Sequence, residues 1–215
     1  MLATTTRTDG DRVFLRNVSW DLYTQLRDDP ERDRVRMTYD DGVLELMSPS
    51  GPHERLNRTL QGLVETWCEV HRIPYANFGS TTYRKQRAKA GLEPDTCFYI
   101  QHEAEVRNHE EVDLTRDPPP DLALEVDIRS NSQGRMPIYA RLGVPEVWRL
   151  GADSLRMYQL TDARKYDEIP SSLALPGLRP EFLLQFLQRR GEIDTGSLMR
   201  EFAAAAADST DELQG

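Results

Sequence analysis

The chain has 215 residues, 38% of them hydrophobic, which suits one domain of ordinary size with a proper core. A formal net charge of −9 excludes adhesion to nucleic acid through overall charge, although a nuclease needs only a local basic track. Cys68 and Cys97 lie in apolar runs, which indicates buried thiols in a reducing compartment. No signal segment opens the chain and no apolar run could span a bilayer, so we expect a cytoplasmic protein without membrane contact.

The N-terminal region predicts a frayed end and then a short helix. Residues 1–12 are rich in Thr, Asp and Arg and are expected to fray. Ser19 is a typical helix N-cap, and three side chains after it form a predicted buried stripe, Leu22, Tyr23 and Leu26.

A hairpin and a long helix follow. Strands are predicted over 34–39 and 43–47, because the Asp41-Gly42 pair between them is a strong reversal signal. Residues 52–71 have the clearest helical period of the sequence, and its apolar stripe consists of Leu56, Leu60, Leu63, Val64 and Trp67.

The remaining pattern completes a single domain. The other predicted elements are a strand at 78–84, a basic turn at 84–91, a helix at 134–142, a hairpin of 145–150 with 154–160, a helix at 180–188 and a mobile tail at 203–215. We therefore divide the chain into a flexible N-terminus (1–14), one domain (15–190) and a C-terminal helical or disordered tail (191–215).

Two further predicted strands carry acidic side chains. Glu93-Pro94-Asp95 leads into the apolar run 97–100, and the second strand covers 120–128. Because side chains alternate along a strand, Glu125 and Asp127 share one face, roughly 6–7 Å apart. The opposite face is apolar, with Leu122, Leu124, Val126 and Ile128. Carboxylates in such a strand are costly to bury unless they are paired or bind a cation, so a metal site is the first hypothesis.

Each acidic residue also has a purely structural interpretation. Asp95 suits a turn cap after Pro94, and Glu125 suits an ion pair with a buried arginine such as Arg135. Asp127 suits an ordinary strand end. Glu54 suits a solvated carboxylate in the first turn of its helix, where the helix dipole favours negative charge.

Five ordered blocks carry a resemblance to a known family. They are the segments 44–49 (LELMSP), 53–54 (HE), 93–100 (EPDTCFYI), 118–127 (PPPDLALEVD) and 137–149 (PIYARLGVPEVWR). Over roughly residues 15–190 the chain resembles the Uma-two family of endonucleases, within the PD-(D/E)XK restriction-endonuclease-like superfamily. The resemblance implies an α/β (α+β) fold, in which helices flank a mixed β-sheet core after an N-terminal β-hairpin. It also implies a phosphodiesterase that depends on Mg²⁺ or Mn²⁺.

The resemblance also assigns roles to residues. Asp95 and Glu125 would hold the metal, with Asp127 as a further candidate of the site. Asp127 stands where the superfamily usually has a catalytic Lys. The basic role would pass to Arg135, four residues before Tyr139, while His53 and Glu54 would add groups from the first long helix. Arginine effectively cannot lose its proton, so Arg135 would act electrostatically but not as a general base.

Three functions remain open from the sequence. The first is a metal-dependent endonuclease acting on DNA. The second is a nucleic-acid-binding or regulatory protein of the same fold without turnover, and the third is an interaction module that does not bind nucleic acid. The basic turn at 84–89 suits either a phosphate track or a solvated loop. A homodimer is expected through the exposed hairpin strands and residues 144–148.

Overall fold

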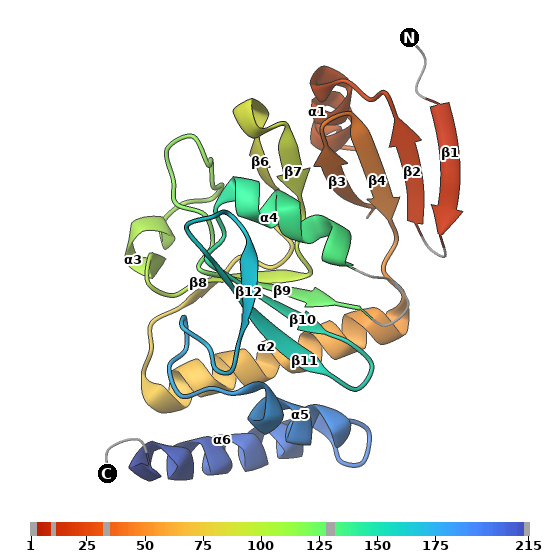
Figure 1. Ribbon diagram of the computed structural model, residues 1–215. Coiled ribbons are helices and arrows are strands. Elements are labelled where there is room, and N and C mark those ends of the chain that lie inside the picture. The colour runs from red at the N-terminus through yellow and green to blue at the C-terminus, as the bar shows by residue number, and fades with distance from the viewer. Residues whose placement is uncertain (1–3, 10–11, 32–34, 128–131, 213–215) are drawn as a thin grey trace.

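The computed structural model describes residues 4–9, 12–31, 35–127 and 132–212. Within them two six-stranded sheets stand side by side (Figure 1). The first, sheet A, has the order β1 (Thr4–Asp9), β2 (Arg12–Arg16), β4 (Val43–Met47), β3 (Arg36–Asp40), β7 (Ala90–Leu92) and β6 (Tyr83–Lys85). The second, sheet B, has the order β12 (Tyr166–Ile169), β11 (Leu155–Leu160), β10 (Glu146–Leu150), β9 (Leu122–Val126), β8 (Thr96–Tyr99) and β5 (Ala76–Asn77).

Sheet B is the mixed sheet that the resemblance implies. Its strands β9 and β10 run parallel, and every other pair of neighbouring strands in it is antiparallel. The helices are α1 (Trp20–Asp28), α2 (Gly51–His71), α3 (Glu103–Val106), α4 (Met136–Leu142), α5 (Pro180–Gln188) and α6 (Thr195–Glu212), with 3₁₀ turns η1 (Gln86–Ala88) and η2 (Ser132–Arg135). None of the helices in these described ranges combines the length and apolarity that a bilayer crossing demands.

Helices cover both faces of sheet B (Figure 1). The apolar stripe of α2 packs in one core with Leu122, Leu124 and Val126 of β9 and with side chains of α5 and α6. Ala123 of the same strand faces a second core that includes Ile138 and Tyr139 of α4. The predicted alternation of β9 is therefore confirmed for the described residues, while Ile128 lies outside them.

The predicted hairpin of sheet A is confirmed as β3 and β4. Asp41 and Gly42 between them have φ angles of 38° and 94°, in the left-handed region that Asp-Gly turns require. The helix predicted at 52–71, the hairpin of β10 with β11 and the helix at 180–188 are confirmed as well. Both cysteines are free and buried, as expected.

Both chain ends are more ordered than the sequence predicted. Thr4–Asp9, expected to fray, forms β1 and pairs with β2, because a Thr-rich segment fits a strand once a partner edge is available. Of the tail predicted from 203, residues 203–212 are part of α6, in line with the helical alternative, and residues 213–215 lie outside the described ranges. Leu198, Phe202 and Ala206 of α6 are buried in the core beside α2. The limits of the central domain, 15 and 190, stay a prediction.

Two smaller predictions were wrong. Of the expected stripe of α1 only Tyr23 is buried, where it stacks on Tyr39; Leu22 and Leu26 are 37% and 36% exposed. A helix this short docks through its aromatic side chain instead of a full stripe. The strand predicted at 78–84 reduces to β6, because Gly79 has a positive φ and the Thr81 N–H donates to the Phe78 carbonyl oxygen, which makes a turn.

Candidate functional site

Strand pairing brings the two predicted metal ligands together. Thr96 of β8 lies opposite Leu124 of β9 in an antiparallel register. One step further along this register, Asp95 lies opposite Glu125, and directly opposed side chains share a face of the sheet. Both residues are buried, with exposed fractions of 2% and 1%.

The Asp95 carboxylate is held by three groups from different elements. Its Oδ2 accepts a hydrogen bond from the Val126 backbone N–H at 2.7 Å and lies 3.0 Å from Nε2 of His53 on α2. Its Oδ1 contacts Nη1 of Arg36, a residue of β3 in sheet A. The site thus lies where both sheets and the start of α2 meet.

The first turns of α2 fix this corner. Asn57 Nδ2 donates to the Asp95 carbonyl oxygen at 3.0 Å, and its Oδ1 accepts from the Thr96 hydroxyl at 3.1 Å. Glu54 Oε1 lies 2.7 Å from Arg36 Nη2, and His53 Nδ1 lies 3.9 Å from the same oxygen. Glu54, expected from pattern alone to be solvated, is only partly exposed and pairs with this arginine.

Glu125 is surrounded by α4 and the turn before it. Arg135 Nη1 lies 3.0 Å from Glu125 Oε2, and the Tyr139 hydroxyl donates to Oε1 of the same carboxylate. The other arm of Arg135, Nη2, lies 2.9 Å from Glu45 Oε1, which is also 3.3 Å from Arg12 Nε. The ion pair between Glu125 and Arg135, one of the structural interpretations of the sequence, is therefore present.

Burial and charge shift the pKa values of these groups in different directions. Complete burial raises the pKa of Glu125, against the opposing effects of Arg135 and the Tyr139 hydroxyl. Burial also disfavours the charge of Arg135, but Glu125 and Glu45 outweigh it and hold its pKa above the usual value. The pKa of His53 is lowered, first by burial and next by the charge of Arg36. Burial also lowers the pKa of Arg36.

Asp127 lies just beyond β9 and faces a different partner. Its Oδ2 lies 2.8 Å from Nη2 and 3.1 Å from Nε of Arg149 on β10. Its backbone N–H donates to the Leu150 carbonyl oxygen at 2.7 Å. Asp127 is therefore tied to the neighbouring strand, although its charge still contributes to the raised pKa of Glu125.

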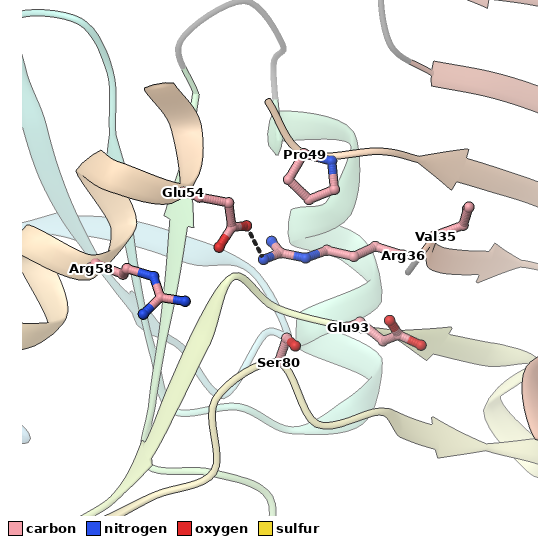
Figure 2. A pocket seen from close by; sticks show the side chains of 7 residues that line it. All are labelled: Val35, Arg36, Pro49, Glu54, Arg58, Ser80 and Glu93. Carbon is pink, nitrogen blue, oxygen red and sulfur yellow. Dashed lines mark hydrogen bonds and ion pairs between the residues drawn. The ribbon is translucent and has the colours of Figure 1, made fainter. Parts of the chain in front are cut away.

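A cavity of about 430 Å³ opens beside Asp95. Arg36 reaches across it to Glu54, and Arg58 of α2 points toward the same space (Figure 2). The other lining residues are Val35, Pro49, Ser80 and Glu93. Because Arg36 contacts both Asp95 and Glu54, its guanidinium separates the buried carboxylate from the cavity.

The family follows from a sequence comparison. The sequence model of the family Uma2, described as "Putative restriction endonuclease", matches residues 20–188. The chain belongs to the Uma2 family. A comparison with curated proteins found no match.

A solved structure supports the fold of this Uma2 chain. It is a crystal structure from Anabaena variabilis, described as a "putative nuclease belonging to DUF820". The two chains share 14% identity and superpose with a TM-score of 0.58, over 79% of this chain and 99% of the other. At this identity the similarity shows a shared fold of the restriction-endonuclease type.

Members of the restriction-endonuclease-like group generally use divalent metals, and the donors here fit such an ion in kind. Mg²⁺ prefers oxygen ligands and takes one or two carboxylates, which Asp95 and Glu125 offer next to the Val126 backbone. Within the described ranges, however, no group of three or more His, Cys, Asp or Glu side chains is arranged around a metal position. The cation that touches Asp95 is the guanidinium of Arg36.

Sequence reasoning missed Arg12, Arg36 and Tyr139 as members of this candidate site, and it left open whether Glu45 faces the site or water. Glu45 alternates with apolar neighbours on a hairpin strand, which leaves its direction open. Tyr139 lies four residues after Arg135, and this helical spacing was a usable signal, because such residues share a helix face. Arg12 and Arg36 reach the site only through the packing of sheet A against α2 and β8, for which the sequence has no local signal.

Proposed function

We propose that this chain is a metal-dependent endonuclease that hydrolyses phosphodiester bonds in DNA. The observation that carries the proposal is the pairing of Asp95 and Glu125 on adjacent strands beside a cavity lined by arginines. Membership of the Uma2 family supports it.

Asp95 and Glu125 would hold a divalent cation, which supplies a reactive water and offsets the negative charge on the phosphate. The residues around them have positioning roles. His53 and the Val126 N–H orient Asp95, while Tyr139 and Arg135 orient Glu125. Arg135 keeps its proton at any ordinary pH, so it contributes charge and geometry but no proton transfer.

Two arginines of the cavity suit a nucleic-acid substrate. Arg36 and Arg58 face the space next to Asp95, and guanidinium groups bind phosphate through paired hydrogen bonds (Figure 2). A local cationic patch of this kind compensates for the negative net charge of the whole chain.

The test is nicking of supercoiled plasmid in the presence of Mg²⁺ or Mn²⁺. We expect cleavage by the native chain, its loss with EDTA, and a drop of about 10³-fold or more in Asp95→Asn and Glu125→Gln. Asp153→Asn, in the exposed turn between β10 and β11, is the matched control and should cut at the native rate. Cleavage that persists in both site variants, or in EDTA, contradicts the proposal.

A second function has its own support in the site. Arg135 stands in place of the usual Lys, and each carboxylate already contacts an arginine, which suits a nucleic-acid-binding or regulatory protein without turnover. Binding of DNA that weakens with salt, without any cleavage, would favour this function. If the chain neither binds nor cuts DNA, the result favours the third function, an interaction module that does not bind nucleic acid.

Assembly and location are proposals of the same kind. Residues 144–148 were expected to serve a homodimer, but Val144, Glu146, Val147 and Trp148 are at most 1% exposed and β10 lies inside sheet B, so this segment cannot form the interface. A homodimer through another surface is tested by the mass in solution, against 24.7 kDa for one chain. A cytoplasmic location has support from two free, buried thiols, since reducing compartments keep cysteines in this form.

A further inference from the structure

We propose that Arg36 is an exchangeable counter-cation at Asp95: a divalent cation enters the site by displacing its guanidinium, which then turns into the cavity toward the phosphate of the substrate. This inference rests on the proposed function, because it concerns how the same site takes up its metal and its substrate.

The two oxygens of Asp95 are held differently. Oδ2 has the Val126 N–H and His53 as partners, so it keeps its place if Arg36 leaves. Oδ1 contacts Arg36 Nη1, which is a group of a side chain and not of the backbone. A cation of higher charge can compete with this guanidinium for Oδ1.

Arg36 also has a place to go. Its side chain is 10% exposed and lines the cavity of about 430 Å³ (Figure 2). Its second arm, Nη2, lies 2.7 Å from Glu54, whose side chain is 37% exposed. Glu54 can thus retain the guanidinium near the cavity after Nη1 has left Asp95.

The other central arginine lacks this freedom. Arg135 is 3% exposed, and its two arms bind Glu125 at 3.0 Å and Glu45 at 2.9 Å. A guanidinium that bridges two buried carboxylates cannot leave without exposing both of them to each other's charge. Of these two arginines, only Arg36 can therefore be displaced by a metal ion.

The charges of the network favour the uptake of a cation. Among the described residues it combines four carboxylates with three guanidiniums, namely Glu45, Glu54, Asp95 and Glu125 with Arg12, Arg36 and Arg135. Removal of the Arg36 charge deepens this negative excess at close range. The affinity of the site for a divalent cation should then increase.

The test measures Mn²⁺ binding without nucleic acid, by calorimetry and by electron paramagnetic resonance. We expect Arg36→Gln to bind Mn²⁺ about tenfold tighter or more than the native chain. Arg58→Gln removes the same charge from the wall of the same cavity and should change the affinity less than threefold. The double variant Arg36→Gln/Asp95→Asn should lose the gain, which assigns it to this carboxylate.

Folding is checked first by circular dichroism and thermal melting. If Arg36→Gln does not fold, Arg36→Lys takes its place; its single ammonium cannot contact Asp95 and Glu54 with two arms, and a gain of severalfold is expected. An affinity that is unchanged or weaker in the folded variant overturns the inference, as does an equal gain in Arg58→Gln. The Mn²⁺ measurement does not depend on cleavage. A tighter Mn²⁺ site in a chain that never cuts DNA would therefore support this inference and contradict the proposed endonuclease function.

Discussion

Sheet B contains two kinds of buried carboxylate. Asp121 and Glu146, at the starts of β9 and β10, are 3% and 1% exposed, much like Asp95 and Glu125. Asp121 Oδ2 accepts from the backbone N–H groups of Ile100 at 2.7 Å and His102 at 3.0 Å, and its Oδ1 lies 2.5 Å from Nδ1 of the His102 ring. Glu146 Oε2 accepts from two more, and its Oε1 accepts from the Trp148 indole.

The difference lies in the partners and not in the depth of burial. Backbone N–H groups are fixed by the fold, so a carboxylate that they satisfy holds loops in place. Asp95 and Glu125 instead each contact the side chain of an arginine, and of these two arginines we propose only Arg36 as exchangeable for a metal ion. Burial alone therefore does not distinguish Asp95 and Glu125 from Asp121 and Glu146, whereas their contacts with arginine do.

The largest expected effect is the loss of stability when a buried carboxylate held by backbone N–H groups is removed. Glu146→Ala leaves the backbone N–H groups of Leu173 and Ala174 and the Trp148 indole without an acceptor, so we expect a loss of about 3–5 kcal/mol in the free energy of unfolding. Urea denaturation measures it. Glu168→Ala, with a side chain 54% exposed, is the control and should cost less than about 0.5 kcal/mol. Equal losses in the two variants would mean that the contacts of Glu146 stabilise the fold no more than those of an exposed carboxylate.

A smaller loss in the free energy of unfolding is expected when Arg135 is replaced by another cationic side chain. In Arg135→Lys one ammonium cannot reach both Glu125 and Glu45 as the two arms of Arg135 do, so we expect a cost of about 1–2 kcal/mol. If the chain is a nuclease, the same change should raise its cleavage rate, because Lys can lose a proton. Arg141→Lys, on the helix α4 that follows Arg135 and paired with Asp40, should leave the rate unchanged. An unchanged rate in Arg135→Lys speaks against a role for this position in the site.

The smallest expected effect is a dependence of stability on pH through His53. Its folded pKa lies below the ordinary value of 6.5, because burial and Arg36 disfavour its charge. As the pH falls below about 6.5, the unfolded chain binds a proton that the folded chain does not, and stability decreases. The slope from this one group is at most about 1.4 kcal/mol per pH unit.

His53→Gln isolates that contribution. Urea midpoints between pH 7.5 and pH 5 should fall less steeply in the variant than in the native chain. Parallel curves would mean that the environment of His53 does not hold it neutral in the folded state.

Local patterns were sufficient for much of this fold. The stripe of α2, the Asp-Gly turn of the first hairpin and the alternation of β9 all depend on residues close in sequence, so their periods and turn signals were readable. The ordered motifs also singled out Asp95 and Glu125, and the antiparallel register of β8 and β9 places them opposite each other.

The tertiary structure alone decided which cations meet those carboxylates. Arg36 comes from the other sheet and Arg12 from a strand near the N-terminus, while β1 and the end of α6 are ordered by partners distant in the sequence. Such contacts depend on how whole elements pack, and a side chain in a polar or weakly periodic segment does not reveal its distant partner. The sequence by itself thus determined where the acids of the site lie, and only the packing of two sheets around α2 determined what neutralises them.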